Sequence, residues 1–210
     1  ILFNNVVGKP NHRAVTNLFG DMNVINKMFG WTDDVDRTRK LSYALDHPLP
    51  PVEIGQDEAP CQEVVIEDPV NVNDYIIPIR HTEYEPELTV GSGNRVVAGK
   101  YFDGGTDLGY NRMNFRWGNV GTFQISPGSH MWQVVSKHYK DDEPVPITMC
   151  FGLPPSCTLM AGAGFDYVIL PQGCDEIGIA GAIQGTPVRM AKARTVDAYA
   201  VADCEVVLEG

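Results

Sequence analysis

Three side chains in the second half of the chain could together bind a metal ion: Asn111, His130 and Glu176. They offer an amide oxygen, an imidazole nitrogen and a carboxylate, which is a mostly hard set of ligands. Such a set favours Mn²⁺ or Mg²⁺ over zinc, which prefers cysteine and several histidines. The spacing does not by itself require a metal, because a single histidine at the start of a helix more often has a structural role.

His130 lies at the beginning of a helix that the sequence predicts over about residues 127–139. Ser126 is a good N-cap for this helix, and Pro127 suits its first position. The N-terminal end of a helix carries unpaired N–H groups and a partial positive charge, so a phosphate could bind there. A capping turn without any ligand is the alternative explanation.

Arg112 and Arg116 also stand out, since the chain has only 16 Lys and Arg residues against 27 acidic ones. A guanidinium group can bind a carboxylate or a phosphate through two parallel hydrogen bonds. A weak surface ion pair with an acidic residue is the alternative. On a regular strand Asn111 and Arg116 point to opposite faces, so we expect a bulge or bend between them if both serve one site.

The first 60 residues are expected to hold a strand at 1–8, a helix at 21–30 and a Pro-rich, acidic connection at 46–60. Asp21 is the predicted N-cap of this helix, and Gly30 is predicted to end it. This part of the chain is therefore expected to be an incomplete N-terminal α/β region.

From residue 61 onward, short segments rich in Val, Ile, Tyr and Phe alternate with turn signals. We expect strands at 61–68, 94–103, 108–118, 144–152, 186–195 and 204–210. A further helix is predicted at about 175–183, ended by Gly185. Many strands with few helices indicate a barrel or a strongly bent sheet, so residues 61–210 are predicted to form one mostly antiparallel domain.

Composition limits the classes of partner. The net charge of −11 repels phosphate backbones, which argues against binding to nucleic acid. The five cysteines form no C-x-x-C pair, so reduced thiols in the cytoplasm are predicted, with Cys174 as a buried, inert thiol. No apolar run approaches the length of a membrane span, and no signal peptide is recognised. Both ends of the chain look cut from a longer protein.

Several segments together resemble the UbiD family of reversible decarboxylases, which use prenylated FMN. The matching segments are "ILFNNVVG", "TNLFGD", "APCQEVV", "VPITMCFGLPPSCTLMAG" and "DEIGIAGAIQGTPVRMAKART". The resemblance covers nearly the whole chain. It implies an α+β fold, in which residues 61–210 form a mostly antiparallel, FMN-binding split β-barrel like that of flavin reductases.

The resemblance also implies a role for individual residues. Asn111, His130 and Glu176 would bind the metal, Mn²⁺ or Mg²⁺, and link it to the cofactor phosphate, with K⁺ possible nearby. Arg116 would be the catalytic residue that holds the substrate carboxylate. The implied cofactor-binding residues are Asn111, Met113, Asn114, Phe115, Arg116, Ser129, His130 and Glu176.

The implied reaction is the reversible, non-oxidative decarboxylation of an aromatic or α,β-unsaturated carboxylic acid. The implied partners are that acid, carbon dioxide, a prenyltransferase that supplies the cofactor, and further copies of the chain in a homo-oligomer. The family's acidic pair, which includes the proton donor, and its C-terminal α/β domain are expected beyond residue 210. An FMN-dependent oxidoreductase on a split barrel and a non-catalytic flavin-binding subunit are the alternatives.

Overall fold

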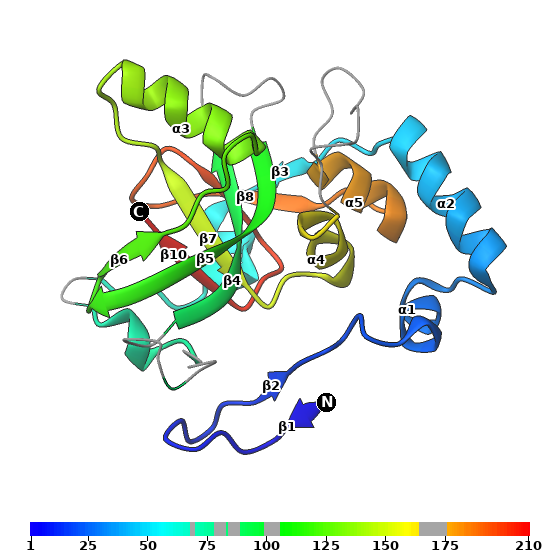
Figure 1. Ribbon diagram of the computed structural model, residues 1–210, viewed down its shortest axis with the longest axis horizontal. Coiled ribbons are helices and arrows are strands. Elements are labelled where there is room, and N and C mark those ends of the chain that lie inside the picture. Colours follow the sequence, from blue (N-terminus) through cyan, green and yellow to red (C-terminus); the bar gives the residue numbers. More distant parts are fainter. Residues whose placement is uncertain (68–69, 78–82, 84–88, 99–105, 164–175) are drawn as a thin grey trace.

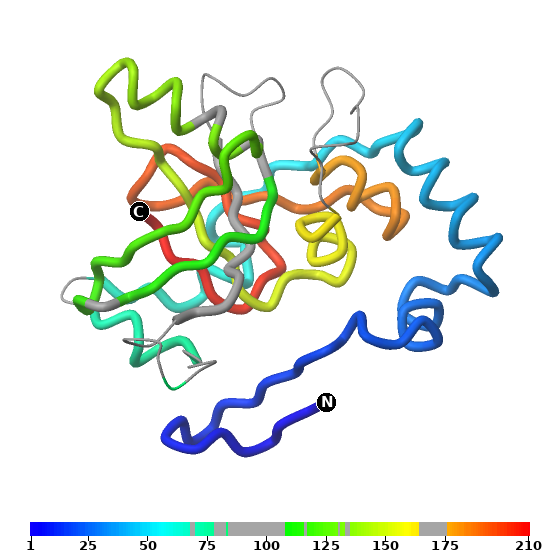
Figure 2. The backbone as a smooth tube through the Cα atoms, in the orientation of Figure 1, coloured from blue at the N-terminus to red at the C-terminus, as the bar shows by residue number. Residues whose placement is uncertain are grey.

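The computed structural model describes residues 1–67, 70–77, 83, 89–98, 106–163 and 176–210 (Figures 1 and 2). At 89–98, 106–107, 116, 130 and 133–134 it describes the backbone alone. Cys174 and its predicted burial therefore lie outside the described residues. None of the helices in the described part of the chain has the length and hydrophobicity that crossing a bilayer requires.

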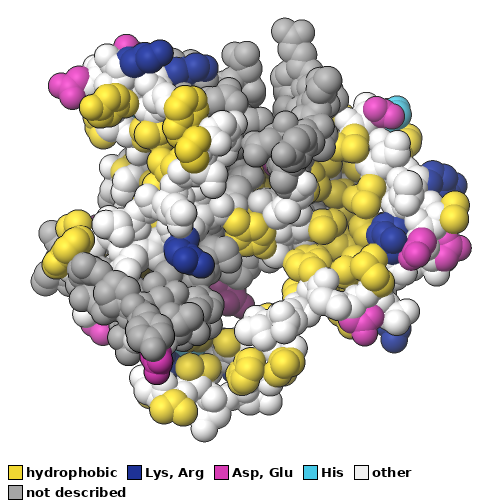
Figure 3. Space-filling model, viewed as in Figure 1, with side chains coloured by type: hydrophobic (Ala, Val, Ile, Leu, Met, Phe, Trp, Pro, Cys, Tyr) yellow, Lys and Arg dark blue, Asp and Glu magenta, His cyan; other side chains and the backbone are white. Residues whose placement is uncertain are grey.

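The first 20 residues form an N-terminal arm that runs along the lower edge of Figures 1 and 2, apart from the other strands. Its two short antiparallel strands are β1 (Leu2–Phe3) and β2 (Ala14–Val15). The predicted strand at 1–8 is thus reduced to two residues. Apolar side chains of the arm, among them Phe3 and Val7, are exposed to solvent (Figure 3).

Two helices follow the arm. The first, α1 (Met22–Phe29), confirms the predicted caps, because the Asp21 side chain accepts a hydrogen bond from the Asn23 N–H at 2.8 Å and Gly30 is left-handed with φ 64°. The second, α2 (Asp34–Asp46), was not predicted. It is capped by Asp33, and most of its surface faces solvent, so its sequence lacks a strong apolar stripe.

The remaining described strands form two sheets. The larger is antiparallel throughout and has the order β10-β7-β4-β5-β6. The smaller has the order β3-β8-β9, with β3 parallel to β8. Their bounds are β3 (Val52–Ile54), β4 (Thr89–Ala98), β5 (Thr106–Trp117), β6 (Val120–Phe123), β7 (Ile147–Phe151), β8 (Arg189–Lys192), β9 (Tyr199–Val201) and β10 (Val206–Glu209).

These sheets make a mixed α/β fold. The described strands do not join into a closed barrel, so the split barrel stays a prediction. The strand β3 lies inside the segment 46–60 that was expected to be a connection, and its pairing with β8 ties this segment to the second half of the chain.

The prediction of a strand at 61–68 is wrong for residues 61–67, which the structure describes. Pro60–Gln62 instead form a 3₁₀ helix, η2, and 63–67 contain no strand. Val64, Val65 and Ile66 are all exposed, so the apolar run is not evidence of a buried strand. Two further 3₁₀ helices are η1 (Gln56–Glu58) and η3 (Val72–Asp74).

Three helices accompany the sheets: α3 (His130–Lys140), α4 (Pro155–Ala161) and α5 (Glu176–Gln184). The N-cap of α3 is Ser129 and not the predicted Ser126, because Gly128 adopts φ 87°, which a right-handed helix cannot include. The helix α5 confirms the prediction closely, and Gly185 follows it with φ 78°. The helix α4 was missed, since its Pro-Pro start suggested a turn.

The main hydrophobic core lies where α4 and α5 pack against the sheets (Figure 1). A second cluster joins strands β5 and β7 of the larger sheet to η3 and the residues after it, and consists of Val72, Ile76, Met113, Phe115 and Met149. The two clusters hold β5 between them, because Leu108 belongs to the first and Met113 and Phe115 belong to the second.

Candidate functional site

The strand β5 contacts both helices that begin with a predicted metal ligand. It carries Asn111 and Arg116, while His130 is the first residue of α3 and Glu176 the first residue of α5. Both helices contact β5. The elements that bear the predicted ligands are thus brought together. The side chains of Arg116 and His130 lie outside the described set, so their roles stay predictions.

The irregularity expected in β5 is confirmed. In the pairing with β6, Asn114 lies opposite Thr122 but Trp117 lies opposite Val120, so β5 contains one extra residue between these pairs. This is the pattern of a β-bulge, which breaks the regular alternation of side chains. Simple alternation therefore does not decide which face of β5 Arg116 occupies.

Close backbone packing surrounds the bulge. A Cβ on Gly121 would lie 2.9 Å from Asn114 O and 2.9 Å from Phe115 Cδ1, so only glycine lets β6 approach β5 this closely. On the other side, Asn73 Nδ2 donates a hydrogen bond of 2.9 Å to Phe115 O. The backbone beside Arg116 is thus fixed by contacts from two separate segments.

Two buried amide oxygens lie near this backbone. Among the described residues, neither Asn114 Oδ1 nor Asn73 Oδ1 has a hydrogen-bond donor. A buried acceptor without a donor is costly, so such atoms often mark the place of a bound molecule. Met113 and Phe115, also predicted to line the cofactor, are buried in the hydrophobic cluster with Met149. Their side chains therefore pack in the core, which leaves their backbone for any cofactor contact.

Glu176 is 1% exposed, and it opens a helix whose other residues through Gly181 are also buried. It is the one charged residue of α5. The positive end of the helix dipole stabilises a carboxylate at this position. A buried carboxylate needs hydrogen bonds, a positive partner or a metal ion, and Glu176 as a metal ligand stays a prediction.

Ser129, predicted to contact the cofactor, uses its hydroxyl within the cap of α3. The hydroxyl donates to Ser126 O at 2.8 Å and accepts from the Trp132 N–H at 3.2 Å. Ser126 thus supports the cap through its carbonyl instead of forming it. These bonds fix the first turn of α3, whose leading N–H groups have no acceptors within the helix.

No group of three or more His, Cys, Asp or Glu side chains within the described ranges could hold a metal ion. The predicted site depends on the amide of Asn111 and on the His130 side chain, which is not described. The metal site therefore stays a prediction.

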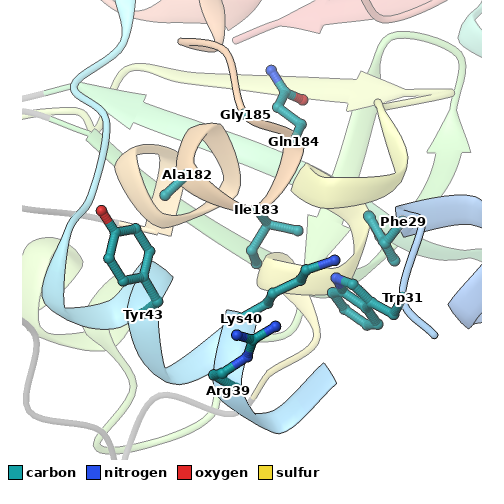
Figure 4. A pocket seen from close by; sticks show the side chains of 9 residues that line it. All are labelled: Phe29, Trp31, Arg39, Lys40, Tyr43, Ala182, Ile183, Gln184 and Gly185. Carbon is teal, nitrogen blue, oxygen red and sulfur yellow. The ribbon is translucent and has the colours of Figure 1, made fainter. Parts of the chain in front are cut away.

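A cavity of about 460 Å³ lies elsewhere, between the α1–α2 region and the C-terminal end of α5 (Figure 4). It is lined by Phe29, Trp31, Arg39, Lys40, Tyr43, Ala182, Ile183, Gln184 and Gly185. None of the predicted site residues lines it. Both of its basic residues bind Asp36, at 2.7 Å for Arg39 and 3.0 Å for Lys40.

The acidic residue beside this cavity organises its basic side chains. Hydrogen bonds from Arg39 and Lys40, together with one from the Thr32 N–H, hold the pKa of Asp36 well below its usual range. The cavity was not predicted. The spacing of Asp36, Arg39 and Lys40 at i, i+3 and i+4 is the signal that could have revealed α2 and its basic face.

Comparison with known proteins decides the family. Residues 52–210 match the family model described as the UbiD 3-octaprenyl-4-hydroxybenzoate carboxy-lyase Rift-related domain. The chain belongs to the UbiD family. The match covers about three quarters of its length and includes every strand from β3 to β10.

Individual UbiD relatives are longer than this chain. Gallate decarboxylase of Lactiplantibacillus plantarum is 30% identical over 217 residues, which cover 100% of this chain and 43% of that protein. The closed form of vanillic acid decarboxylase from Sedimentibacter hydroxybenzoicus superposes with a TM-score of 0.87 at 25% identity, over 100% of this chain and 44% of that one. The chain thus spans less than half the length of these relatives.

A second solved structure is of a UbiD-class enzyme in complex with its cofactor. An evolved dimeric form of HmfF from Pelotomaculum thermopropionicum, solved with prFMN, gives a TM-score of 0.86 at 23% identity. It covers 100% of this chain and 47% of that one. The likeness shows that this UbiD chain has the fold of the matched part of that protein.

Proposed function

We propose that this UbiD protein decarboxylates an aromatic or α,β-unsaturated carboxylic acid, without net oxidation, using prenylated FMN. The observation that carries the proposal is the match of residues 52–210 to the UbiD family. It is supported by the gallate decarboxylase, which aligns with the whole chain. An electron-rich phenolic acid is therefore the first substrate class to test.

The residues around the β5 bulge fit a flavin. Asn114 Oδ1 and Asn73 Oδ1 are buried acceptors without described donors, and a flavin offers N–H and hydroxyl donors. The backbone of Met113, Asn114 and Phe115 would line the ring. When bound, the prenylated flavin would supply an electrophilic carbon that withdraws electrons from the carbon losing carbon dioxide.

The cofactor phosphate would lie at the first turn of α3, beside Ser129. Helix N-termini suit phosphate groups because of their free N–H groups and partial positive charge. Asn111, His130 and Glu176 would hold Mn²⁺ or Mg²⁺, with K⁺ as a further ion. Through such a metal these three side chains would help to position the cofactor phosphate.

Arg116 would bind the substrate carboxylate. A guanidinium forms two hydrogen bonds to a carboxylate, which fixes both its position and its direction. Holding the acid in one orientation lowers the entropic part of the barrier. The bulge lies in the stretch of β5 that contains Arg116, between the pairs formed by Asn114 and Trp117. No residue of this chain is assigned as the general acid.

The wider architecture is part of the same proposal. We infer a split barrel within residues 61–210, preceded by a partial N-terminal α/β region at 1–60, and a homo-oligomer as the working form. The cofactor would come from a prenyltransferase, and the cytoplasm is the proposed location.

The test is to produce the protein together with a flavin prenyltransferase and to analyse the bound flavin by mass spectrometry. We expect a flavin heavier than FMN and release of carbon dioxide from gallate or another phenolic acid. Unmodified FMN with hydride transfer to an acceptor would instead favour the oxidoreductase. Bound flavin without turnover of any acid in a panel would favour the non-catalytic subunit.

Replacing Arg116 tests its role directly. Arg116→Ala should abolish both decarboxylation and carbon dioxide exchange, because the substrate carboxylate loses its partner, while the remaining cofactor-binding residues should still hold the flavin. Arg112→Ala is the matched control, since Arg112 is an exposed arginine on the same strand. Retained turnover in Arg116→Ala would remove this residue from catalysis.

A further inference from the structure

The cavity of about 460 Å³ beside α2 contains none of the residues that the proposed decarboxylation uses. Its volume lies within the usual range for small-molecule sites, about 300–1,000 Å³, and its lining combines apolar and aromatic side chains with two basic ones. Glu176 lies at the other end of α5, about 12 Å away along the helix axis. The cavity therefore lies apart from this predicted metal ligand.

One face of α2 supplies the polar wall of the cavity. Arg39, Lys40 and Tyr43 follow Asp36 after three, four and seven positions, so they lie on its side of the helix. Their side chains and the C-terminal end of α5 line the same cavity (Figure 4). The spacing along α2 thus brings two cations and an aromatic ring to one wall.

The two basic side chains are held in place but keep hydrogen-bond donors to spare. Arg39 donates to Asp36 Oδ1 through Nη2 alone, so its Nε and Nη1 have no acceptor among the described residues. Lys40 Nζ contacts Asp36 Oδ2 at 3.0 Å and donates to Gly30 O at 3.1 Å, which leaves one of its three N–H groups. An anion in the cavity would therefore meet donors that Asp36 already orients.

Aromatic and aliphatic side chains form the rest of the wall. The rings of Phe29 and Trp31 stack with their centroids 4.6 Å apart, and Trp31 is 6% exposed, so packing fixes this part of the wall. Ala182 and Ile183 of α5 add aliphatic surface. A flat aromatic ring gains both apolar contact and stacking from such walls. The lining therefore favours an aromatic molecule over an aliphatic one.

The charges around the cavity favour a single negative charge on that molecule. Arg39 and Lys40 carry two positive charges, and Asp36 cancels one of them. The C-terminal ends of α1 and α5, at Gly30 and Gly185, add partial negative charge. A carboxylate balances the remaining positive charge, whereas a phosphate dianion would exceed it and a cation would be repelled.

We propose that this cavity binds a small aromatic carboxylic acid, with its carboxylate at Arg39 and Lys40 and its ring against Phe29 and Trp31. Phenolic acids belong to this class, but the proposal does not depend on the decarboxylation, because Arg116 does not line the cavity and binding here involves no turnover. A bound acid would join the basic face of α2 to the C-terminal end of α5.

The first experiment compares three ligands that share one ring system and differ in charge. Isothermal titration measures their binding to the unaltered protein: 2-naphthoate, the neutral 2-naphthalenemethanol and the cation 2-naphthylmethylammonium. We expect 2-naphthoate to bind at least about tenfold more tightly than the alcohol, since a hydrogen bond to a charged group contributes that much. Equal affinities for acid and alcohol, or tighter binding of the cation, would overturn the proposal.

Hydrogen exchange locates the bound acid. We expect 2-naphthoate to protect backbone amides in residues 29–43 and 182–185, the segments that carry the lining. Protection confined to β5 and the first turn of α3 would instead place the acid at the predicted cofactor site and overturn the proposal. Arg116→Ala should keep the protection of 29–43, and its loss there would assign the acid to the proposed substrate position.

Substitutions on α2 test the carboxylate contact. Arg39→Gln should weaken the binding of 2-naphthoate at least about tenfold and leave that of the alcohol unchanged within about twofold. Arg37→Gln is the matched control, because Arg37 binds Asp34 three positions before it, as Arg39 binds Asp36, but does not line the cavity. It should bind 2-naphthoate like the unaltered protein, and equal weakening in both variants would overturn the proposal. The ligand comparison and the exchange map decide the question even if a variant fails to fold.

Discussion

The two helices that begin with a predicted metal ligand, α5 and α3, are held in place by different forces. Every residue of α5 from Glu176 to Gly181 is buried, so tertiary packing positions this helix. In α3, Met131 is buried, but Trp132 is 44% and Tyr139 is 84% exposed. The start of α3 is set by the local cap at Ser129.

This difference shows how a single site can combine two kinds of support. Glu176 cannot move without disturbing the core, because it and the next five residues of its helix are buried. The first turn of α3 depends on a few hydrogen bonds at the surface, so it can change without loss of the fold. Substitutions in α5 should therefore lower global stability, whereas those at the α3 cap should act mainly near the site.

The largest difference is expected from truncating a core side chain of α5. Ile179 is 1% exposed in the main cluster, so Ile179→Ala should lower the free energy of unfolding by about 2–5 kcal/mol, from lost burial and the cavity left behind. Trp132→Ala, the matched change in α3, should cost about 0.5 kcal/mol. Urea unfolding measures both. Similar losses in the two variants would contradict the contrast between the helices.

A smaller effect is expected where α5 touches the chain before β3. A Cβ on Gly181 would lie 3.0 Å from Leu49 O and 3.3 Å from Thr186 O. Gly181→Ala should therefore cost about 1–3 kcal/mol through overpacking. Helix propensity alone would give the opposite sign, with a gain of about 1 kcal/mol. Thermal unfolding distinguishes the loss expected from overpacking from the gain expected from helix propensity. A gain in stability would show that the backbone at Leu49 and Thr186 shifts away from the new methyl group at little cost.

The sequence predicted those elements whose signals are local and strong. The caps Asp21 and Gly30 determined the bounds of α1, and Gly185 marked the end of α5. The irregular stretch of β5 followed from placing Asn111 and Arg116 in one site, since regular alternation separates them. The family resemblance supplied the grouping of β5, α3 and α5, which spacing alone could not.

Other features depend on contacts that the sequence does not display. The strand β3 has three residues and pairs with β8, more than 130 positions away. The helix α4 begins with Pro155 in a first-turn position, which resembles a turn signal until the helix is seen.

The smallest effect is expected from the α3 cap. Ser129→Ala removes the acceptor of the Trp132 N–H, which should cost about 1 kcal/mol. Ser136→Ala, within the same helix, is the matched control and should change stability by less than about 0.5 kcal/mol. If the first turn of α3 binds the cofactor phosphate, Ser129→Ala should also weaken flavin retention on dialysis, while Ile179→Ala should retain flavin as long as it stays folded. Equal flavin loss in both variants would mean that cofactor binding follows global stability and not the local cap.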